Sequence, residues 1–115
     1  MAHPVVHFEV SGQNLDTLQS FYSELFGWKT QKVPGDMRYA MVEQEEGGIG
    51  GGIGQAPNGS GHVTFYVGAD DPQAVLDKAE QLGGRTILPV TALPQVTIAL
   101  FADPEGHVIG VAKGM

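Results

Sequence analysis

The chain has 115 residues, a length that fits one domain with its own core and is too short for two independent ones. Six lysines and arginines stand against thirteen aspartates and glutamates, which gives a net charge of −7. Such a surface repels nucleic-acid phosphates and anionic lipids, so we expect neither nucleic acid nor a membrane surface as a partner. The chain contains no cysteine, which excludes disulfides, thiolate metal sites and cysteine nucleophiles.

The sequence carries no pattern typical of export or membrane insertion. Its apolar runs are shorter than the roughly 20 residues that a membrane span requires. Residues Met1–Val10 lack the basic region and the long apolar region of a signal peptide. Together with the lack of cysteine, these features predict a cytoplasmic protein.

The first half of the sequence predicts a strand, a helix and three more strands. Val5–Val10 is rich in β-branched and aromatic residues, as strands are. Asn14 is a favourable helix N-cap, the apolar residues after it recur with helical spacing, and Gly27 ends the helix. The further strands are expected at Trp28–Val33, Met37–Glu43 and the glycine-rich segment Gly48–Gly54.

The second half repeats this order after a linker at Gln55–Gly61. His62–Val67 predicts a strand, and Asp71-Pro72 starts a helix that stops at Gly83-Gly84. Three more strands are expected at Arg85–Val90, Val96–Ala102 and His107–Ala112.

An internal repeat supports two βαβββ halves. Val6–Val10 is similar to Val63–Val67 at an offset of 57 residues, and near the ends of the halves Gly51 matches Gly110 at an offset of 59. Halves of about 55 residues bury too little surface to stand alone. We therefore expect a single α+β domain over residues 1–115, in which halves at about 4–55 and 61–113 pair into one curved, mostly antiparallel sheet cup.

Four stretches, in this order, resemble the vicinal oxygen chelate superfamily, which includes glyoxalase I, extradiol dioxygenases and bleomycin-resistance proteins. They are Val5–Val10, Phe21–Trp28, Ala79–Gly84 and Phe101–Gly106, the last followed by a strand. The resemblance implies the glyoxalase/bleomycin-resistance fold and a homodimer. Metal-dependent members of the superfamily take two histidines and carboxylates from the first and last strands of each half.

The ligand set that the resemblance implies is incomplete in this chain. His7 stands where a family histidine falls, but the repeat places Thr64 at the matching position, with His62 two residues earlier on that strand. The last strand of each half, called here the closing strand, should supply the remaining ligands at Gly51 and Gly110. Both positions are glycines, and neither closing strand contains Asp or Glu. We therefore expect no metal cofactor, with His7 and His62 as the candidate ligands if one is bound.

His107 is a third candidate, but its parity relative to Gly110 places it on the opposite sheet face.

The residues expected to bind a small-molecule ligand lie on the two first strands of the halves. Glu9 shares a strand face with His7, so an imidazole and a carboxylate point the same way. Thr64 and Tyr66 are their counterparts in the second half. An alternative for Glu9 is a structural salt bridge to Arg38 or Arg85.

These residues predict a metal-free, glyoxalase-like small-molecule-binding protein similar to the bleomycin-resistance branch. The alternative is a metal-dependent lyase, isomerase or dioxygenase of the same superfamily. A dimerising scaffold without a ligand is a third interpretation. The sequence assigns neither a ligand nor a catalytic residue.

Overall fold

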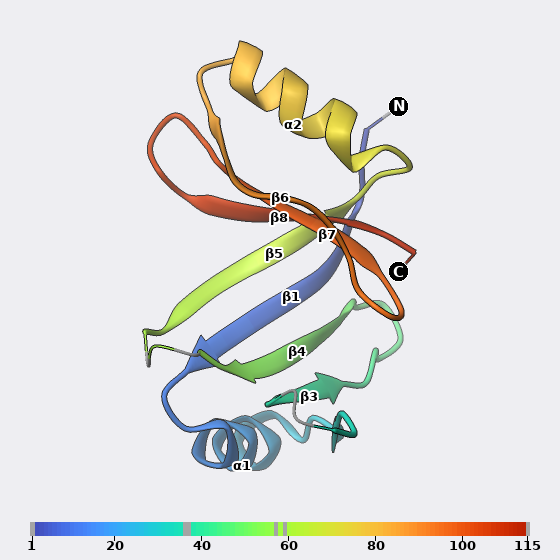
Figure 1. Cartoon of the computed structure of the whole chain (residues 1–115). Helices are drawn as coiled ribbons and strands as arrows, with labels where there is room; N and C mark the ends of the chain where they lie inside the picture. Colours follow the sequence, from blue (N-terminus) through green and yellow to red (C-terminus); the bar gives the residue numbers. More distant parts are fainter. Residues whose placement is uncertain (1, 36–37, 57, 59, 115) are drawn as a thin grey trace. The chain divides into compact units, whose positions relative to one another are not determined.

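The structure is a computed structural model that describes residues 2–35, 38–56, 58 and 60–114 (Figure 1). Within these residues the chain forms eight strands and two helices, which confirms the predicted order of elements. In chain order they are β1 (Val5–Gly12), α1 (Leu15–Phe26), β2 (Thr30–Lys32), β3 (Tyr39–Val42), β4 (Gly50–Gln55), β5 (His62–Gly68), α2 (Pro72–Gln81), β6 (Arg85–Ala92), β7 (Thr97–Ala102) and β8 (Val108–Lys113).

The element boundaries differ from the predicted ones by a few residues. Strand β4 starts at Gly50, two residues later than expected, because Gly47 has a φ of 80° and Gly48 donates a turn hydrogen bond to the Glu45 carbonyl. Met37, where the sequence predicts the third strand to start, lies outside the described residues. So do Pro57 and Gly59 of the predicted linker.

The chain divides into two compact units. Residues 7–63 make the first, called here the N-terminal unit, and residues 64–115 with the first six residues make the second, the C-terminal unit. No helix among the described residues is long and apolar enough to cross a membrane.

The N-terminal unit contains four strands in the order β2-β3-β4-β1, with helix α1 packed on β3 and β4. Strands β1 and β4 are parallel and the other pairs are antiparallel. The Asn14 side chain caps α1 by accepting the Thr17 N–H at 3.0 Å, and Gly27 ends the helix with a φ of 72°. The core of this unit consists of the buried residues Leu15, Ala40, Val42 and Ile53, with Phe8, Leu18, Tyr22 and Trp28 packed against them.

The register between β1 and β4 separates two faces of this sheet. Phe8 pairs with Gly51, and its ring fills the space where a side chain of residue 51 would lie, on the face that packs against α1. Glu9 pairs with Gly52. His7 and Glu9 therefore lie on the opposite face from Phe8, as their spacing predicts.

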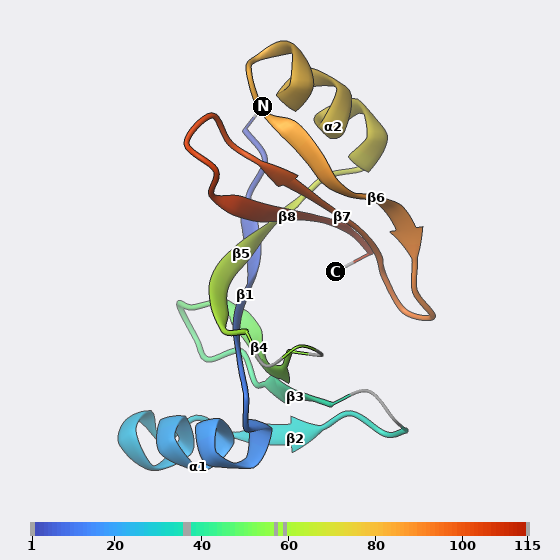
Figure 2. The ribbon, with the colours of Figure 1, turned by 60° about the vertical axis from the view of Figure 1, so that its left-hand side comes forward.

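The C-terminal unit repeats this arrangement with the strand order β5-β8-β7-β6. The first two residues of β5, His62 and Val63, belong to the N-terminal unit. Helix α2 starts at the Asp71 cap and packs on β6, β7 and β8 (Figure 2). Its core residues are Leu76, Ala99 and Val111. Strand β8 is parallel to β5 and antiparallel to β7, so each unit has one parallel pair in a mostly antiparallel sheet.

Candidate ligand site

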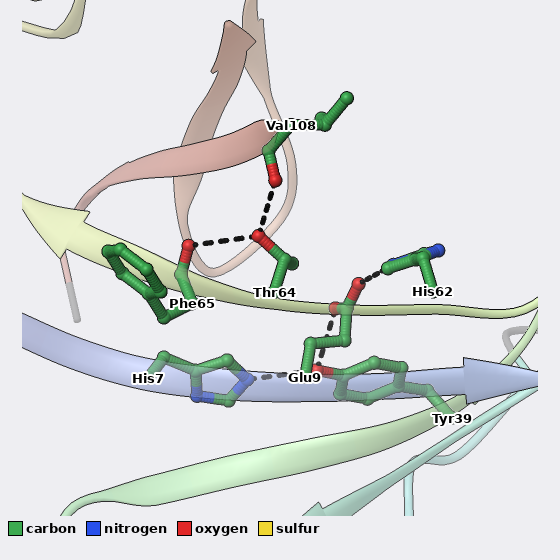
Figure 3. Close-up of polar contacts among 7 residues, drawn as sticks. All are labelled: His7, Glu9, Tyr39, His62, Thr64, Phe65 and Val108. Atoms are coloured by element: carbon green, nitrogen blue, oxygen red, sulfur yellow. Dashed lines mark hydrogen bonds and ion pairs between the residues drawn. The ribbon is translucent and has the colours of Figure 1, made fainter. Parts of the chain in front are cut away.

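A chain of hydrogen bonds connects His7, Tyr39 and Glu9 on the face of the N-terminal unit opposite α1 (Figure 3). The Tyr39 hydroxyl donates to Oε1 of Glu9 at 3.0 Å, and Nε2 of His7 lies 2.8 Å from the same hydroxyl. A hydroxyl has one proton, and here it is directed at Glu9. His7 must therefore donate its Nε2–H to Tyr39.

Strand β5 contributes His62 to the same carboxylate. Its Nε2 lies 2.8 Å from Oε2 of Glu9. An ionised carboxylate only accepts hydrogen bonds, so Nε2 of His62 carries the proton. The Glu9 side chain is 15% exposed and that of His62 is 51% exposed. A largely buried carboxylate is thus bonded to a half-exposed imidazole.

Burial of the imidazole lowers the pKa of His7 below its usual value of 6.5, and the nearby charge of Glu9 opposes this shift only in part. His7 is 4% exposed. The buried ring is therefore held neutral at pH 7, which agrees with the donation of its Nε2–H to Tyr39.

Glycines on β4 allow Tyr39 to lie across that strand. A Cβ atom on Gly52 would lie 1.8 Å from the Tyr39 hydroxyl oxygen, and one on Gly54 would lie 3.1 Å from the ring. Only residues without a side chain leave room for the ring here. Our sequence analysis missed Tyr39, although an aromatic residue on a strand beside a glycine-rich strand is a usable signal for such packing.

Glu9, Tyr39 and His62 form part of the wall of a cleft of about 840 Å³ in the N-terminal unit. Five of the remaining wall residues have polar side chains. These remaining residues are Ser11, Arg38, Gly54, Gln55, Ala56, Asn58, Ser60 and Gly61.

The expected alternative of a Glu9–Arg38 salt bridge is not formed. Arg38 donates from Nη2 to Oε1 of Gln55 at 3.2 Å, and the same oxygen accepts the Leu15 N–H at 3.3 Å. The neutral amide of Gln55 therefore positions the guanidinium group at the cleft. Glu9 does not neutralise its positive charge.

Thr64 and Tyr66, the two other predicted binding residues, lie in the C-terminal unit. The Thr64 hydroxyl donates to the Val108 carbonyl at 2.7 Å, and Tyr66 is 7% exposed, with its ring over Gly110. Of the four predicted residues, the structure thus connects His7 and Glu9 through Tyr39. The contribution of Thr64 and Tyr66 to ligand binding stays a prediction.

The strand registers correct the mapping of the closing strands. Tyr66 pairs with Gly110 in the C-terminal unit, and Glu9 pairs with Gly52 in the N-terminal unit. The counterpart of Gly110 is therefore Gly52, and Gly51 lies on the helix-packed face. The mapping of Gly51 was wrong because a shift of one residue on a strand changes the face.

The closing strands offer no carboxylate for a metal of the kind that the superfamily resemblance implies. Gly52 lies under the Tyr39 hydroxyl, and a Cβ on Gly110 would be 2.3 Å from the Tyr66 ring. Tyrosine rings therefore occupy the space in which metal-binding side chains would project.

The two histidines of the N-terminal unit do not fit a metal either. Nε2 of each ring donates to another side chain, so a metal could be held only through Nδ1, and Glu9, the carboxylate beside these rings, already accepts hydrogen bonds at both oxygens. Across the part of the chain that the structure describes, no three His, Asp or Glu side chains are grouped so that they could hold a metal ion. No metal-dependent step follows from these residues.

The third histidine that the sequence offered lies elsewhere. Nδ1 of His107 is 3.0 Å from Asp103 in the exposed turn before β8, and backbone N–H donors lower the pKa of that aspartate. This turn is not part of the cleft wall.

Two βαβββ halves with this strand order define a protein of the glyoxalase and bleomycin-resistance fold. The chain matches the glyoxalase-like domain family over residues 7–112, and it belongs to that family. No curated protein sequence matches the chain.

Solved structures with a similar fold include two methylmalonyl-CoA epimerases. The one from Mycobacterium tuberculosis is 12% identical, with a TM-score of 0.74 over 96% of this chain and 87% of that one. The one from Streptomyces coelicolor, solved as a single-residue variant in complex with 2-nitronate-propionyl-CoA, is 17% identical, with a TM-score of 0.73 over 99% and 96%.

A superfamily member from Vibrio splendidus is similar to the same extent. It is 18% identical, with a TM-score of 0.68 over 97% of this chain and 99% of that one. At these identities the likeness shows the fold, and the function must be argued from the side chains.

Proposed function

We propose that this protein binds a small molecule in the cleft of its N-terminal unit without the help of a metal. The observation that carries the proposal is the Glu9 carboxylate, held on both oxygens by Tyr39 and His62 at the wall of a cleft of about 840 Å³. Ligand pockets in proteins have volumes of this order, about 300–1,000 Å³.

The charges at the cleft suggest the chemistry of the ligand. Each oxygen of Glu9 accepts one hydrogen bond from the protein and can accept a further one from a ligand N–H or O–H. Arg38 supplies a guanidinium group, which suits a carboxylate or another anionic oxygen. We therefore favour a small molecule that carries both a hydrogen-bond donor and an acidic group.

The second candidate is a lyase or isomerase, which the fold similarity to methylmalonyl-CoA epimerases brings into consideration. A metal-dependent form of that candidate would need donors in place of Gly52 and Gly110. We therefore keep the metal-dependent enzyme as the alternative that the binding experiment tests. Loss of ligand binding in EDTA would favour it.

The experiment is a thermal-shift screen of small carboxylic acids and amino acids against the wild-type protein and two variants. Glu9→Gln removes the charge in the cleft, and Glu24→Gln removes a charge from helix α1 as a matched control. We expect a ligand that raises the melting temperature of wild type and E24Q alike, binds E9Q at least about tenfold more weakly, and is unaffected by EDTA. Equal binding to E9Q, or loss of binding in EDTA, would contradict the proposal.

A further inference from the structure

We propose that the cleft is a proton-transfer site, in which Nδ1 of His62 takes a proton from the bound molecule and Glu9 positions the imidazole. This inference rests on the proposed binding of a small molecule in the cleft. It adds a reaction class to that binding, namely proton abstraction beside a carbonyl group or from an acidic ligand atom.

The hydrogen bonds around Glu9 determine where the basic nitrogen lies. Because Nε2 of His62 gives its proton to Oε2 of Glu9, the neutral ring has its lone pair on Nδ1. A carboxylate that holds an imidazole in one tautomer also stabilises the imidazolium that forms when the other nitrogen accepts a proton. His62 is thus prepared to act as a base through Nδ1.

The side chains around Glu9 direct their donors at its two oxygens. Oε1 accepts the Tyr39 hydroxyl, which in turn accepts the Nε2–H of His7. All donors of this hydrogen-bond chain are directed toward Glu9, and both of its oxygens act as acceptors. Glu9 therefore donates no proton of its own to Tyr39 or His62. With a side chain that is only 15% exposed, Glu9 is screened from water more than His62, which is 51% exposed and faces the cleft.

A second histidine–carboxylate pair, His107 with Asp103, differs from the pair of His62 and Glu9 in its surroundings. Asp103 accepts the backbone N–H groups of Glu105 and His107 at 2.9 and 3.0 Å in addition to the His107 ring. Its geometry is that of a closed turn, and neither residue of the pair is part of the cleft wall. His107 therefore serves as a matched control for His62.

The proposed step balances without an oxidant or a reductant. A C–H or O–H bond of the ligand breaks, an N–H bond forms at Nδ1 of His62, and the electron pair stays on the ligand, for a carbon acid as an enolate oxygen. Arg38, on the wall of the same cleft, offers a positive charge to that oxygen. Return of the proton to the same or another atom completes an exchange or an isomerisation.

The test uses 5-nitrobenzisoxazole, a general probe for a base in a cleft. The base takes the proton from the ring carbon, the N–O bond breaks, and a coloured cyanophenolate forms. Rates are measured for wild type, His62→Ala and His107→Ala after subtraction of the buffer rate. Because general-base catalysis contributes about 10²–10⁴-fold, we expect H62A to lose at least about tenfold and H107A to keep the wild-type rate.

The role of Glu9 is tested by splitting kcat from KM. We expect Glu9→Gln to lower kcat with little change in KM, because this probe has no N–H or O–H group for Glu9 to accept and Glu9 acts on it only through the orientation and charge of His62. Glu9→Asp should restore part of kcat. A fall in stability alone, with kcat unchanged, would assign Glu9 a structural role and overturn this part.

A non-reacting analogue separates the two proposals. Binding of 5-nitrobenzotriazole is measured by calorimetry for wild type and H62A. If the analogue binds both proteins and their elimination rates are equal, the proton-transfer proposal is wrong and ligand binding stands. If the analogue binds neither protein and no protein raises the rate above that of buffer, the proposed binding site itself is wrong, and the proton-transfer site with it.

Discussion

The hydroxyl oxygen of Tyr39 lies in the space that a side chain on Gly52 would occupy, since a Cβ atom there would be 1.8 Å away from it. This packing of a tyrosine on a glycine brings the hydroxyl between His7 and Glu9. The glycine-rich strand β4 thus determines the geometry of a polar site to which it contributes no side chain.

Gly52→Ala tests that relationship. The methyl group would displace the Tyr39 ring and break its bonds to His7 and Glu9, which leaves the buried His7 donor without this acceptor. We expect a loss of about 1–3 kcal/mol in the free energy of unfolding, measured by urea denaturation, and weaker ligand binding. Gly48→Ala is the control, because a Cβ there would lie at an ordinary 3.6 Å from the Glu45 carbonyl. Equal stability of both variants would show that Tyr39 moves without cost.

Glu9→Gln should change ligand affinity more than stability. The amide can keep one acceptor toward Tyr39 and turn its NH₂ group to His62, whose neutral ring can accept in its other tautomer. A buried ion pair that loses one partner would instead cost about 3–5 kcal/mol. A large fall in melting temperature without any effect on ligand binding would therefore identify Glu9 as a structural residue.

Local patterns in the sequence sufficed for the elements of the fold. The Asn14 cap, the terminal Gly27 and the Asp71-Pro72 start all act through neighbouring residues, so both helices are where the sequence predicts them. The placement of His7 and Glu9 on one face also follows from strand alternation alone.

The partners of Glu9 could not be predicted in the same way, because they depend on register between distant strands. Tyr39 comes from β3 and His62 from β5, and no local pattern measures how far either strand is shifted. His62 lies one pleat before Thr64, and its long side chain nevertheless reaches Oε2 of Glu9. A shift of one residue in the aligned repeat likewise gave Gly51, instead of Gly52, as the counterpart of Gly110.

Because His7 is buried in its neutral form, the free energy of unfolding should fall in mild acid. The folded-state pKa of His7 is lowered, so the unfolded chain takes up this proton first as the pH falls through about 6.5. The stabilisation is complete above that pH and is lost below it, by at most about 1.4 kcal/mol for each pH unit. Urea unfolding at pH 7.5 and 5.5 should show this loss in wild type and in His107→Gln. The loss should be smaller in His7→Gln, which keeps a donor for Tyr39, and an equal loss in all three proteins would assign it to other groups.

We propose that the protein is a homodimer. Helix α1 exposes more than half of Phe21, Leu25 and Phe26, and the short edge strand β2 offers unpaired backbone groups. Sedimentation at tens of micromolar should give twice the chain mass of 12.2 kDa. A species of one chain mass at that concentration would contradict the proposal, and Phe21→Ser with Leu25→Ser tests whether α1 is the contact.

The protein should purify without stoichiometric zinc, nickel, iron or manganese, and it should show no chelator-sensitive activity toward the hemithioacetal of methylglyoxal and glutathione. A catalytic site of this kind keeps three or more protein ligands. Here the closing positions are glycines covered by tyrosine rings, and Nε2 of both His7 and His62 is engaged as a donor. Two imidazoles that offer only their Nδ1 atoms would hold a metal weakly, so dialysis should remove it. Elemental analysis of protein prepared without an affinity tag measures this. One metal per chain that survives dialysis, and is lost together with activity in His7→Ala, would make the metal-dependent enzyme the better account of the site.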